Sequence, residues 1–226
     1  MTQSFERIKK MLAVPSQEQD ITWLLCGDSI THGVVYLDNM RDYTELFHQR
    51  VRTELGRIHD VIIRTAISGW TTRGTLSDIE RRILRHKPDV LSLMLGMNDS
   101  GKHNNLPLKE FRDNYNKILD LAAECSNPAL VMHTANPIWD TAKDCRGALP
   151  EYNEAVRELA AQRGAVLVDH DKYWAEMFKT DPRRLFVCMG DVLHPNHYGH
   201  VAFAHEMFRA LGMWDDNSIM CRLFKP

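Results

Sequence analysis

The chain has 226 residues, of which 44% are hydrophobic and 26% are charged, and its formal net charge at pH 7 is −2. This length and composition are typical of one globular domain with a substantial hydrophobic core. The nearly balanced charge excludes a strongly basic surface, so we expect neither a nucleic acid nor an acidic membrane as a partner.

The first twenty residues differ in character from the rest of the chain. They mix charged and apolar residues and contain no continuous apolar core of the kind found in signal peptides. No later stretch approaches the ~20 apolar residues of a membrane helix. The five cysteines are odd in number and scattered, which favours reduced thiols. We therefore predict a cytoplasmic protein whose residues 1–20 form a helical extension, packed either on the domain or on a partner subunit.

Five apolar runs predict buried strands at residues 21–26, 61–66, 90–95, 130–134 and 165–169. Apolar residues at helical spacing predict amphipathic helices at residues 43–55, 76–86, 109–124, 152–162 and 196–211. Apolar strands that alternate with helices are typical of a parallel sheet covered on both faces. The pattern predicts a three-layer α/β fold with one domain over residues 21–212. The last segment, residues 213–226, is apolar enough to dock on that domain as a tail.

A serine, Ser29, follows the first predicted strand directly. Much later in the chain, Asp191 and His194 stand three residues apart, just before the last predicted helix. A serine hydroxyl becomes a good nucleophile when a histidine takes its proton, and a carboxylate orients that histidine. These three side chains therefore predict a serine hydrolase with Ser29 as nucleophile, His194 as base and Asp191 as the orienting acid.

Four short motifs make the chain resemble the SGNH (GDSL-type) hydrolase family. They are Gly-Asp-Ser at residues 27–29, the segment around Gly69, Gly-Met-Asn-Asp at residues 96–99 and Asp-Val-Leu-His-Pro at residues 191–195. The resemblance extends from about residue 21 to about residue 211, and it implies a flavodoxin-like α/β/α sandwich with a five-stranded parallel sheet. It also implies an oxyanion hole made of the backbone N–H groups of Ser29 and Gly69 and the side-chain amide of Asn98.

The predicted topology and these motifs agree on one location. Ser29, Gly69 and Asn98 follow the first, second and third predicted strands. Ligands of open parallel sheets bind outside the carboxyl ends of the strands. We therefore expect all three residues at the same edge of the sheet, within reach of the loop that carries His194.

Loops at this edge contain side chains that predict contacts with a small-molecule ester, namely Asp28, Trp70, Asn136 and Trp139, with Tyr36 nearby. Aromatic faces beside polar groups suit sugar rings, although packing of the loops explains the aromatic residues equally well. A long-chain lipase needs a wide apolar groove, and no long apolar loop is present to form one. We predict a short-chain acyl or acetyl esterase, with acetylated carbohydrate as one candidate substrate and without a metal or organic cofactor.

Several alternatives stay open. A lysophospholipase or thioesterase is compatible with the same motifs, because a fold does not determine a substrate. A catalytically inactive sugar-binding scaffold would lack a member of the triad, and none is missing. A metal site is disfavoured because the first three histidines of the C-terminal cluster are spaced by three rather than by the four residues of a helical zinc pair. That cluster comprises His194, His197, His200 and His205. Assembly into a homo-oligomer is also left open.

Overall fold

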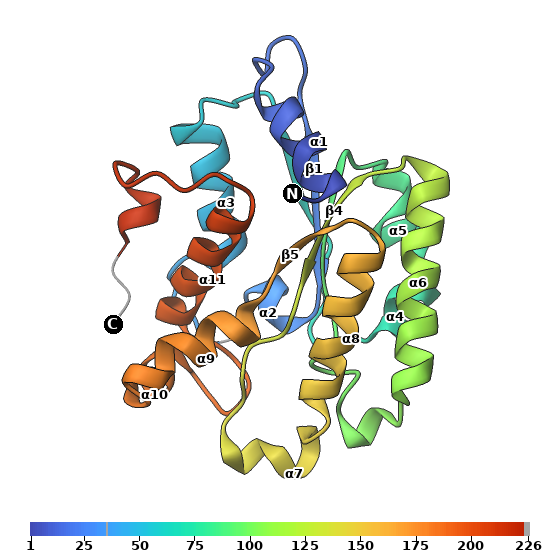
Figure 1. Cartoon of the computed structure of the whole chain (residues 1–226), viewed down its shortest axis with the longest axis vertical. Helices are drawn as coiled ribbons and strands as arrows, with labels where there is room; N and C mark the ends of the chain where they lie inside the picture. Colours follow the sequence, from blue (N-terminus) through green and yellow to red (C-terminus); the bar gives the residue numbers. More distant parts are fainter. Residues whose placement is uncertain (35, 224–226) are drawn as a thin grey trace.

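A five-stranded sheet forms the centre of the computed structural model, which describes residues 1–34 and 36–223 (Figure 1). All neighbouring strands are parallel, and their order is β2-β1-β3-β4-β5. The strands are β1 (Thr22–Gly27), β2 (Val61–Arg64), β3 (Val90–Met94), β4 (Ala129–His133) and β5 (Val166–Val168). This strand order is that of flavodoxin-like proteins, so the predicted fold is confirmed.

Side chains of the internal strand β1 alternate between two hydrophobic cores. Trp23 and Leu25 belong to one cluster of buried residues, whereas Leu24 and Cys26 belong to the other. Successive side chains of a strand lie on opposite faces, so a strand that is covered on both faces has to be apolar throughout. The edge strand β2 is covered only in part, and its residues are correspondingly half-buried or exposed.

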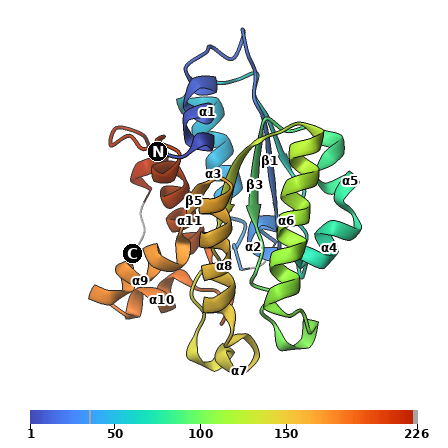
Figure 2. The ribbon, with the colours of Figure 1, turned by 45° about the vertical axis from the view of Figure 1, so that its right-hand side comes forward.

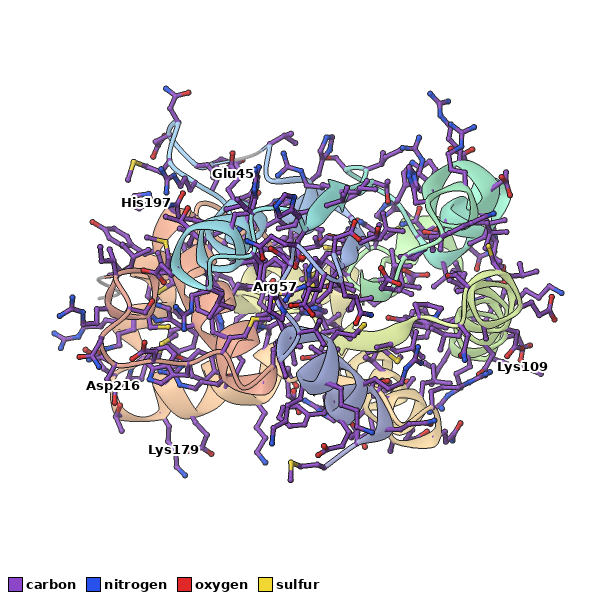
Figure 3. The ribbon with its side chains drawn as sticks, turned by 90° about the horizontal axis from the view of Figure 1, so that it is seen from above. Glu45, Arg57, Lys109, Lys179, His197 and Asp216 are labelled. Carbon is purple, nitrogen blue, oxygen red and sulfur yellow. The ribbon has the colours of Figure 1, made fainter. Side chains whose placement is uncertain are left out.

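Helices cover both faces of the sheet and make it the middle of three layers (Figures 1 and 2). One face packs against α1 (Gln3–Leu12), α3 (Tyr43–Gln49), α9 (His170–Thr180) and α11 (His197–Ala210). The opposite face packs against α4 (Thr72–Ser77), α5 (Ile79–Arg82), α6 (Leu108–Cys125) and α8 (Leu149–Gln162). The view from above shows these helical layers on opposite sides of the sheet (Figure 3).

Short helical segments occupy the connections. The α-helical ones are α2 (Ser29–His32), α7 (Lys143–Arg146) and α10 (Arg183–Cys188). The 3₁₀ turns are Leu84–His86, Lys102–Asn104, Asp140–Ala142 and Met220–Arg222. In Figure 1, α2 and α7 both lie towards the lower end of the sheet, where the carboxyl ends of the strands are found.

The single helix predicted over residues 76–86 is wrong in its extent, because shorter helical pieces occupy this region. Asp78 and Ile83 leave the helical conformation, with φ angles of −125° and −131°, and so separate α4, α5 and the following 3₁₀ turn. Lys87 then adopts a left-handed conformation directly before Pro88, which cannot continue a helix. The periodicity of apolar residues indicates which side of a segment is buried. It does not show whether the segment forms one continuous helix or several short ones.

The helix predicted over residues 43–55 is present, but its second half is wound more widely. After α3, a π-helical turn spans Arg50–Glu54. This turn carries Arg50, whose guanidinium donates hydrogen bonds of 3.0 and 2.7 Å to the carbonyl of Met213. Arg50 is buried. The π-helical turn therefore coincides with a buried contact between this helix and the C-terminal region of the chain.

The N-terminal segment packs on the domain. In α1, the Ser4 hydroxyl accepts a hydrogen bond from the backbone of Leu130, at 3.0 Å, and Ile8 lies fully buried in the core. The loop after α1 is held by Arg57, labelled near the centre of Figure 3, which pairs with Asp60 at 2.7 Å and donates to the carbonyl of Val14 at 2.6 Å. The division of the chain at residue 20 stays a prediction.

The C-terminal segment also contributes to the core. Met213, Met220 and Cys221 are buried in the cluster that contains α3 and α11. Residues 224–226 of the predicted tail lie outside the described residues. The domain boundary at residue 212 stays a prediction.

Two observations bear on cellular location. All five cysteines are free thiols. Among residues 1–34 and 36–223, no helix has both the length and the apolar character needed to cross a lipid bilayer. The cytoplasmic location stays a prediction.

Candidate active site

Ser29 lies where β1 passes into α2. Asp28 is the N-cap of this short helix, and its side chain accepts a hydrogen bond of 3.0 Å from the backbone N–H of Ile30. Gly27 closes the strand, and a β-carbon there would collide with the side chain of Thr31. The turn thus needs a glycine before the cap, and it places Ser29 at the first position of the helix, at the carboxyl end of an internal strand.

Asp191 and His194 are held in a closed loop before α11. An isolated antiparallel bridge joins Met189 to Pro195, and the backbone N–H of Gly190 donates to the carbonyl of His194 at 2.9 Å. Within the loop, one carboxylate oxygen of Asp191 accepts hydrogen bonds from the backbone of Leu193 (2.7 Å) and His194 (2.6 Å). These two hydrogen bonds stabilise the turn and at the same time fix the orientation of the Asp191 side chain.

The three side chains predicted as a triad meet in the structure. The Oγ atom of Ser29 is 2.9 Å from Nε2 of His194, and Nδ1 of His194 is 2.9 Å from Oδ2 of Asp191. Ser29 is buried, while the His194 and Asp191 side chains keep 23% and 28% of their surface exposed. A hydroxyl, an imidazole and a carboxylate hydrogen-bonded in this order form the arrangement that serine hydrolysis requires.

The loops of Gly69 and Asn98 are joined to the Ser29 loop. The backbone N–H of Ile67 donates to the carbonyl of Gly27 at 3.1 Å, and the Asn98 amide donates to the carbonyl of Trp70 at 3.1 Å. Gly69 has a φ of +79°, a conformation that glycine adopts without strain, and nothing lies within 4 Å of the position of a β-carbon. Open space therefore adjoins the Gly69 backbone, and Asn98 keeps its second amide hydrogen available for another acceptor.

Asp99 ties two of these loops together. Its carboxylate accepts hydrogen bonds from the backbone and hydroxyl of Thr72, at 2.8 and 2.6 Å, and from the backbone of Gly96, at 3.1 Å. These bonds connect the start of α4 to the turn after β3. Asp99 thereby fixes the backbone around Asn98.

The electrostatics of Asp191 favour its charged form. Partial burial acts to raise the pKa of this carboxyl group. The hydrogen bonds from the His194 backbone, the His194 ring and the Leu193 backbone outweigh that effect and hold the pKa below its ordinary value. A carboxylate that stays ionised near neutral pH is able to support a positive charge on the adjacent imidazole.

Asp28 behaves in the opposite way. Burial raises the pKa of its carboxyl group to about 7, the Ile30 hydrogen bond acts against the rise, and the charge of Asp99 adds to it. The side chain is 1% exposed and is used to cap α2. The structure thus gives Asp28 a role in capping α2, and its contact with substrate stays a prediction.

Replacing Asp28 by asparagine should stabilise the protein at alkaline pH. Above pH 7 the folded state buries a charged carboxylate, whereas the unfolded state ionises with a pKa of about 3.9 at little cost. The penalty disappears as the pH falls from 7 towards 4, because only the folded state then takes up the proton. Asparagine keeps the helix cap and removes the charge, so Asp28→Asn should gain about 1–3 kcal/mol at pH 8 and much less at pH 5.

Urea unfolding at pH 8 and pH 5 measures this difference. The exposed Asp20→Asn provides the matched control and should change the unfolding free energy by less than about 0.5 kcal/mol at either pH. Equal pH dependence of Asp28→Asn and the wild-type protein would contradict the buried charge.

The other predicted substrate-binding residues have different positions. Asn136 is fully buried, and its amide donates to the carbonyl of Leu193 at 3.1 Å, so it supports the loop of His194. Its contact with substrate stays a prediction. Trp70 is half-buried beneath the guanidinium of Arg82. Trp139 is half-buried and its backbone N–H donates to Val192 at 3.1 Å. Substrate contact by Trp70 and Trp139 stays a prediction.

Tyr36 lies directly beside His194, one of the three predicted catalytic residues. Its ring centroid is 6.0 Å from that of His194, and 46% of its surface is exposed. Its φ is +59°, an uncommon conformation for a bulky residue. Gly190 makes room for it, because a β-carbon at that position would collide with the side chain of Tyr36. Tyr36 therefore forms an aromatic wall beside the histidine.

A buried polar chain was missed by the sequence analysis. The Ser92 hydroxyl lies 2.9 Å from Nε2 of His133, and Nδ1 of His133 lies 3.0 Å from Nε2 of His170. Burial lowers the pKa of His133 to about 3 and that of His170 well below its ordinary value, so both rings are neutral. Polar residues inside apolar strands were the available signal, since Ser92 and His133 interrupt two otherwise apolar runs.

Two histidines of the C-terminal cluster bind protein groups. Nδ1 of His200 accepts a hydrogen bond from the backbone of Tyr43 at 3.1 Å, and Nε2 of His205 donates to the carbonyl of Met220 at 2.9 Å. No group of three His, Cys, Asp or Glu side chains in the described ranges has an arrangement suited to a metal ion.

The sequence matches the family described as "GDSL-like Lipase/Acylhydrolase family" over residues 25–202, which is most of the chain. The chain belongs to this family. It is an SGNH-type esterase, and the resemblance inferred from the four motifs is confirmed.

Two relatives are similar in sequence. An uncharacterised protein of Mycoplasma pneumoniae is 30% identical over 226 residues, covering 89% of this chain, and the chain spans only 25% of that protein's length. An acetylxylan esterase of Geobacillus stearothermophilus is 28% identical over 160 residues, covering 67% of this chain and 72% of that protein.

Solved structures share the fold. An acetylxylan esterase from Geobacillus stearothermophilus superposes with a TM-score of 0.73 at 21% identity, covering 85% of this chain and 94% of that chain. At this level of identity the likeness concerns the fold, and it agrees with the strand order described above.

Proposed function

We propose that this esterase hydrolyses short-chain esters, acetyl esters above all, through an acyl-enzyme on Ser29. The observation that carries the proposal is the continuous hydrogen-bonded chain from Ser29 through His194 to Asp191, with both distances at 2.9 Å. A nucleophile, a base and an orienting group within hydrogen-bond reach of one another are the signature of nucleophilic catalysis.

Acylation begins with proton transfer from Ser29 to Nε2 of His194 as the serine oxygen attacks the ester carbonyl. Asp191 holds the imidazole through Nδ1 and stabilises the positive charge that forms on it. His194 then donates the proton to the alcohol as it leaves. Water, deprotonated by the same imidazole, attacks the acyl-enzyme, and the acid product departs with Ser29 restored.

The oxyanion that forms at the carbonyl oxygen needs preorganised donors. We assign this role to the backbone N–H groups of Ser29 and Gly69 and to the Asn98 amide. Support comes from the hydrogen bond of Asn98 to Trp70, which fixes the amide beside the Gly69 loop, and from the open space next to Gly69. Asp99 acts indirectly, since it fixes the backbone from which Asn98 projects.

Acetylated carbohydrate is the substrate class that we propose. An acetylxylan esterase is among the sequence relatives. In addition, the exposed ring of Tyr36 lies beside His194, and Trp139 borders the same loop. Aromatic faces at the rim of a site provide apolar contact area for the faces of a sugar ring.

A panel of esters tests the proposal. We expect kcat/KM to fall by at least about tenfold from p-nitrophenyl acetate to p-nitrophenyl octanoate, because a site shaped for a short acyl group excludes added methylenes. Acetylated xylooligosaccharides should release acetate. Activity that rises with chain length would instead support the lysophospholipase or thioesterase alternative.

A fluorophosphonate probe separates an active enzyme from an inactive sugar-binding scaffold. The oxygen of an activated serine displaces fluoride from the phosphorus of the probe and forms a phosphonate ester, so mass spectrometry should find the probe attached to Ser29 at a ratio of one per chain. An unlabelled wild-type protein without esterase activity would contradict the proposed function.

A further inference from the structure

Arg146 is a buried cation at the end of α7. Only 6% of its surface is exposed, and its Nη1 atom donates a hydrogen bond of 3.3 Å to Nδ1 of His103. Its Nε–H group is buried and has no hydrogen-bond partner among residues 1–34 and 36–223. An arginine is rarely buried without a paired anion, because removing the charge from water is unfavourable.

The acidic groups near Arg146 do not neutralise it. Asp140 pairs with Lys143 at 2.7 Å, and Asp171 pairs with Arg157 at 2.7 Å. The charge of Arg146 acts on the buried carboxyl group of Asp28. That group has a raised pKa and is only partly ionised near neutral pH, so its compensation is incomplete. Asp171 shares Arg157 with Asp169 and Glu154, and no carboxylate among the described residues is paired with Arg146 itself.

Arg146 is among the residues that line a cavity of about 270 Å³. Ile138 and Leu149 are among its apolar lining residues, and its charged lining residues are Asp140, Lys143, Arg146 and Asp171. Of these four, Arg146 has no ion pair within the described part of the chain. A small concave site that combines apolar contacts with a buried guanidinium lacking an ion pair suits an organic anion. Arginine binds carboxylates well, since its N–H groups form a planar fork.

The cavity lies beside the loops of the active site. Nη1 of Arg146 lies against Gly101, where a β-carbon would collide with it, and the Gly101 backbone donates to the carbonyl of Asn98 at 3.0 Å. On the other side, Ile138 precedes Trp139, whose backbone is bonded to Val192 in the triad loop. A group bound at Arg146 therefore neighbours the loops that carry both the predicted oxyanion donor and the triad.

We propose that Arg146 and this cavity form a subsite for a carboxylate group of the substrate. The preferred esters then carry a carboxylate elsewhere in the molecule, on the acyl or the alcohol part. This inference rests on the proposed esterase function and narrows its substrate class. The bound carboxylate supplies the anionic partner that the guanidinium lacks.

Pairs of charged and neutral esters test the subsite. The hemisuccinate and hemiglutarate of p-nitrophenol are compared with the butanoate and pentanoate, and an acetylated methyl glucuronide with the acetylated methyl glucoside. We expect kcat/KM to favour the anionic member of at least one pair by about tenfold or more. Arg146→Gln should abolish that preference, and Arg146→Lys, which keeps the charge, should retain part of it.

Lys143→Gln is the matched control, because this lysine lines the same cavity but is 65% exposed and already paired with Asp140. It should alter the preference by less than about twofold, since exposed ion pairs contribute little. A wild-type enzyme without preference for any anionic ester, or an Arg146→Gln variant that keeps the preference, would overturn the subsite. A wild-type protein that hydrolyses no ester of either kind would contradict the proposed function instead.

Discussion

Ser29→Ala should lower kcat/KM for p-nitrophenyl acetate by at least about 10⁴-fold. The substitution removes the hydroxyl oxygen that lies 2.9 Å from Nε2 of His194 and acts as nucleophile in the proposed mechanism, so no acyl-enzyme forms. Residual activity then depends on water attacking a substrate held in the oxyanion hole. Initial rates under pseudo-first-order conditions, corrected for spontaneous hydrolysis, measure the loss.

The fold should tolerate this change. Ser29 contributes a small side chain to the start of α2, while the cap of that helix is supplied by Asp28. We expect the unfolding free energy of Ser29→Ala to stay within about 1 kcal/mol of the wild type. Ser77→Ala is the matched control, since this exposed serine bonds only within α4, at 2.8 Å to Gly74, and should retain full activity. Wild-type rates in Ser29→Ala would show that another group is the nucleophile.

Asp191→Asn should lower kcat for the same ester by about 10³–10⁴-fold. The wild-type carboxylate accepts a hydrogen bond from Nδ1 of His194, which leaves Nε2 free to accept the Ser29 proton. An asparagine amide that donates to Nδ1 would place the proton on Nε2 instead. That tautomer is unable to act as a base towards Ser29, although the geometry of the site is preserved.

Asparagine keeps an oxygen that accepts the hydrogen bonds from the Leu193 and His194 backbones. The substitution therefore preserves the loop, and a loss of activity reports on the contact with the His194 ring. Circular dichroism should show an unchanged fold. Asp144→Asn, at an exposed position in α7, is the control and should alter kcat by less than about twofold. A similar small effect of Asp191→Asn would remove Asp191 from the proposed triad.

The pattern of apolar residues along the sequence was sufficient to predict much of the fold. A strand inside a covered parallel sheet has to be apolar on both faces, so runs such as residues 90–95 stand out from the amphipathic segments around them. Helix α6 was predicted within one residue at each end, because its apolar stripe is regular. Helix α9 was missed, although Trp174 and Phe178 recur at helical spacing, because charged residues interrupt the stripe.

Some features of the candidate site were likewise predicted from the sequence, and others were not. Residue type and spacing predicted that Ser29, Asp191 and His194 act together, and the structure places the three side chains in hydrogen-bond contact. Their catalytic roles stay a proposal. The burial of Asn136 and Asp28 was not predicted, because the position of a residue in a loop does not reveal whether its polar side chain faces solvent or supports the loop from beneath.

Periodicity and short motifs were sufficient to predict the class of fold and the edge of the sheet at which Ser29, Asp191 and His194 come together. Both signals are properties of residues that are neighbours in the chain. Three further results came from the folded molecule. The imidazole of His194 lies within hydrogen-bond distance of the Ser29 hydroxyl, Tyr36 lies beside that imidazole, and the buried Nε–H group of Arg146 has no hydrogen-bond partner among the described residues. Each of these depends on contacts between segments far apart in the chain, and local sequence patterns do not encode such contacts.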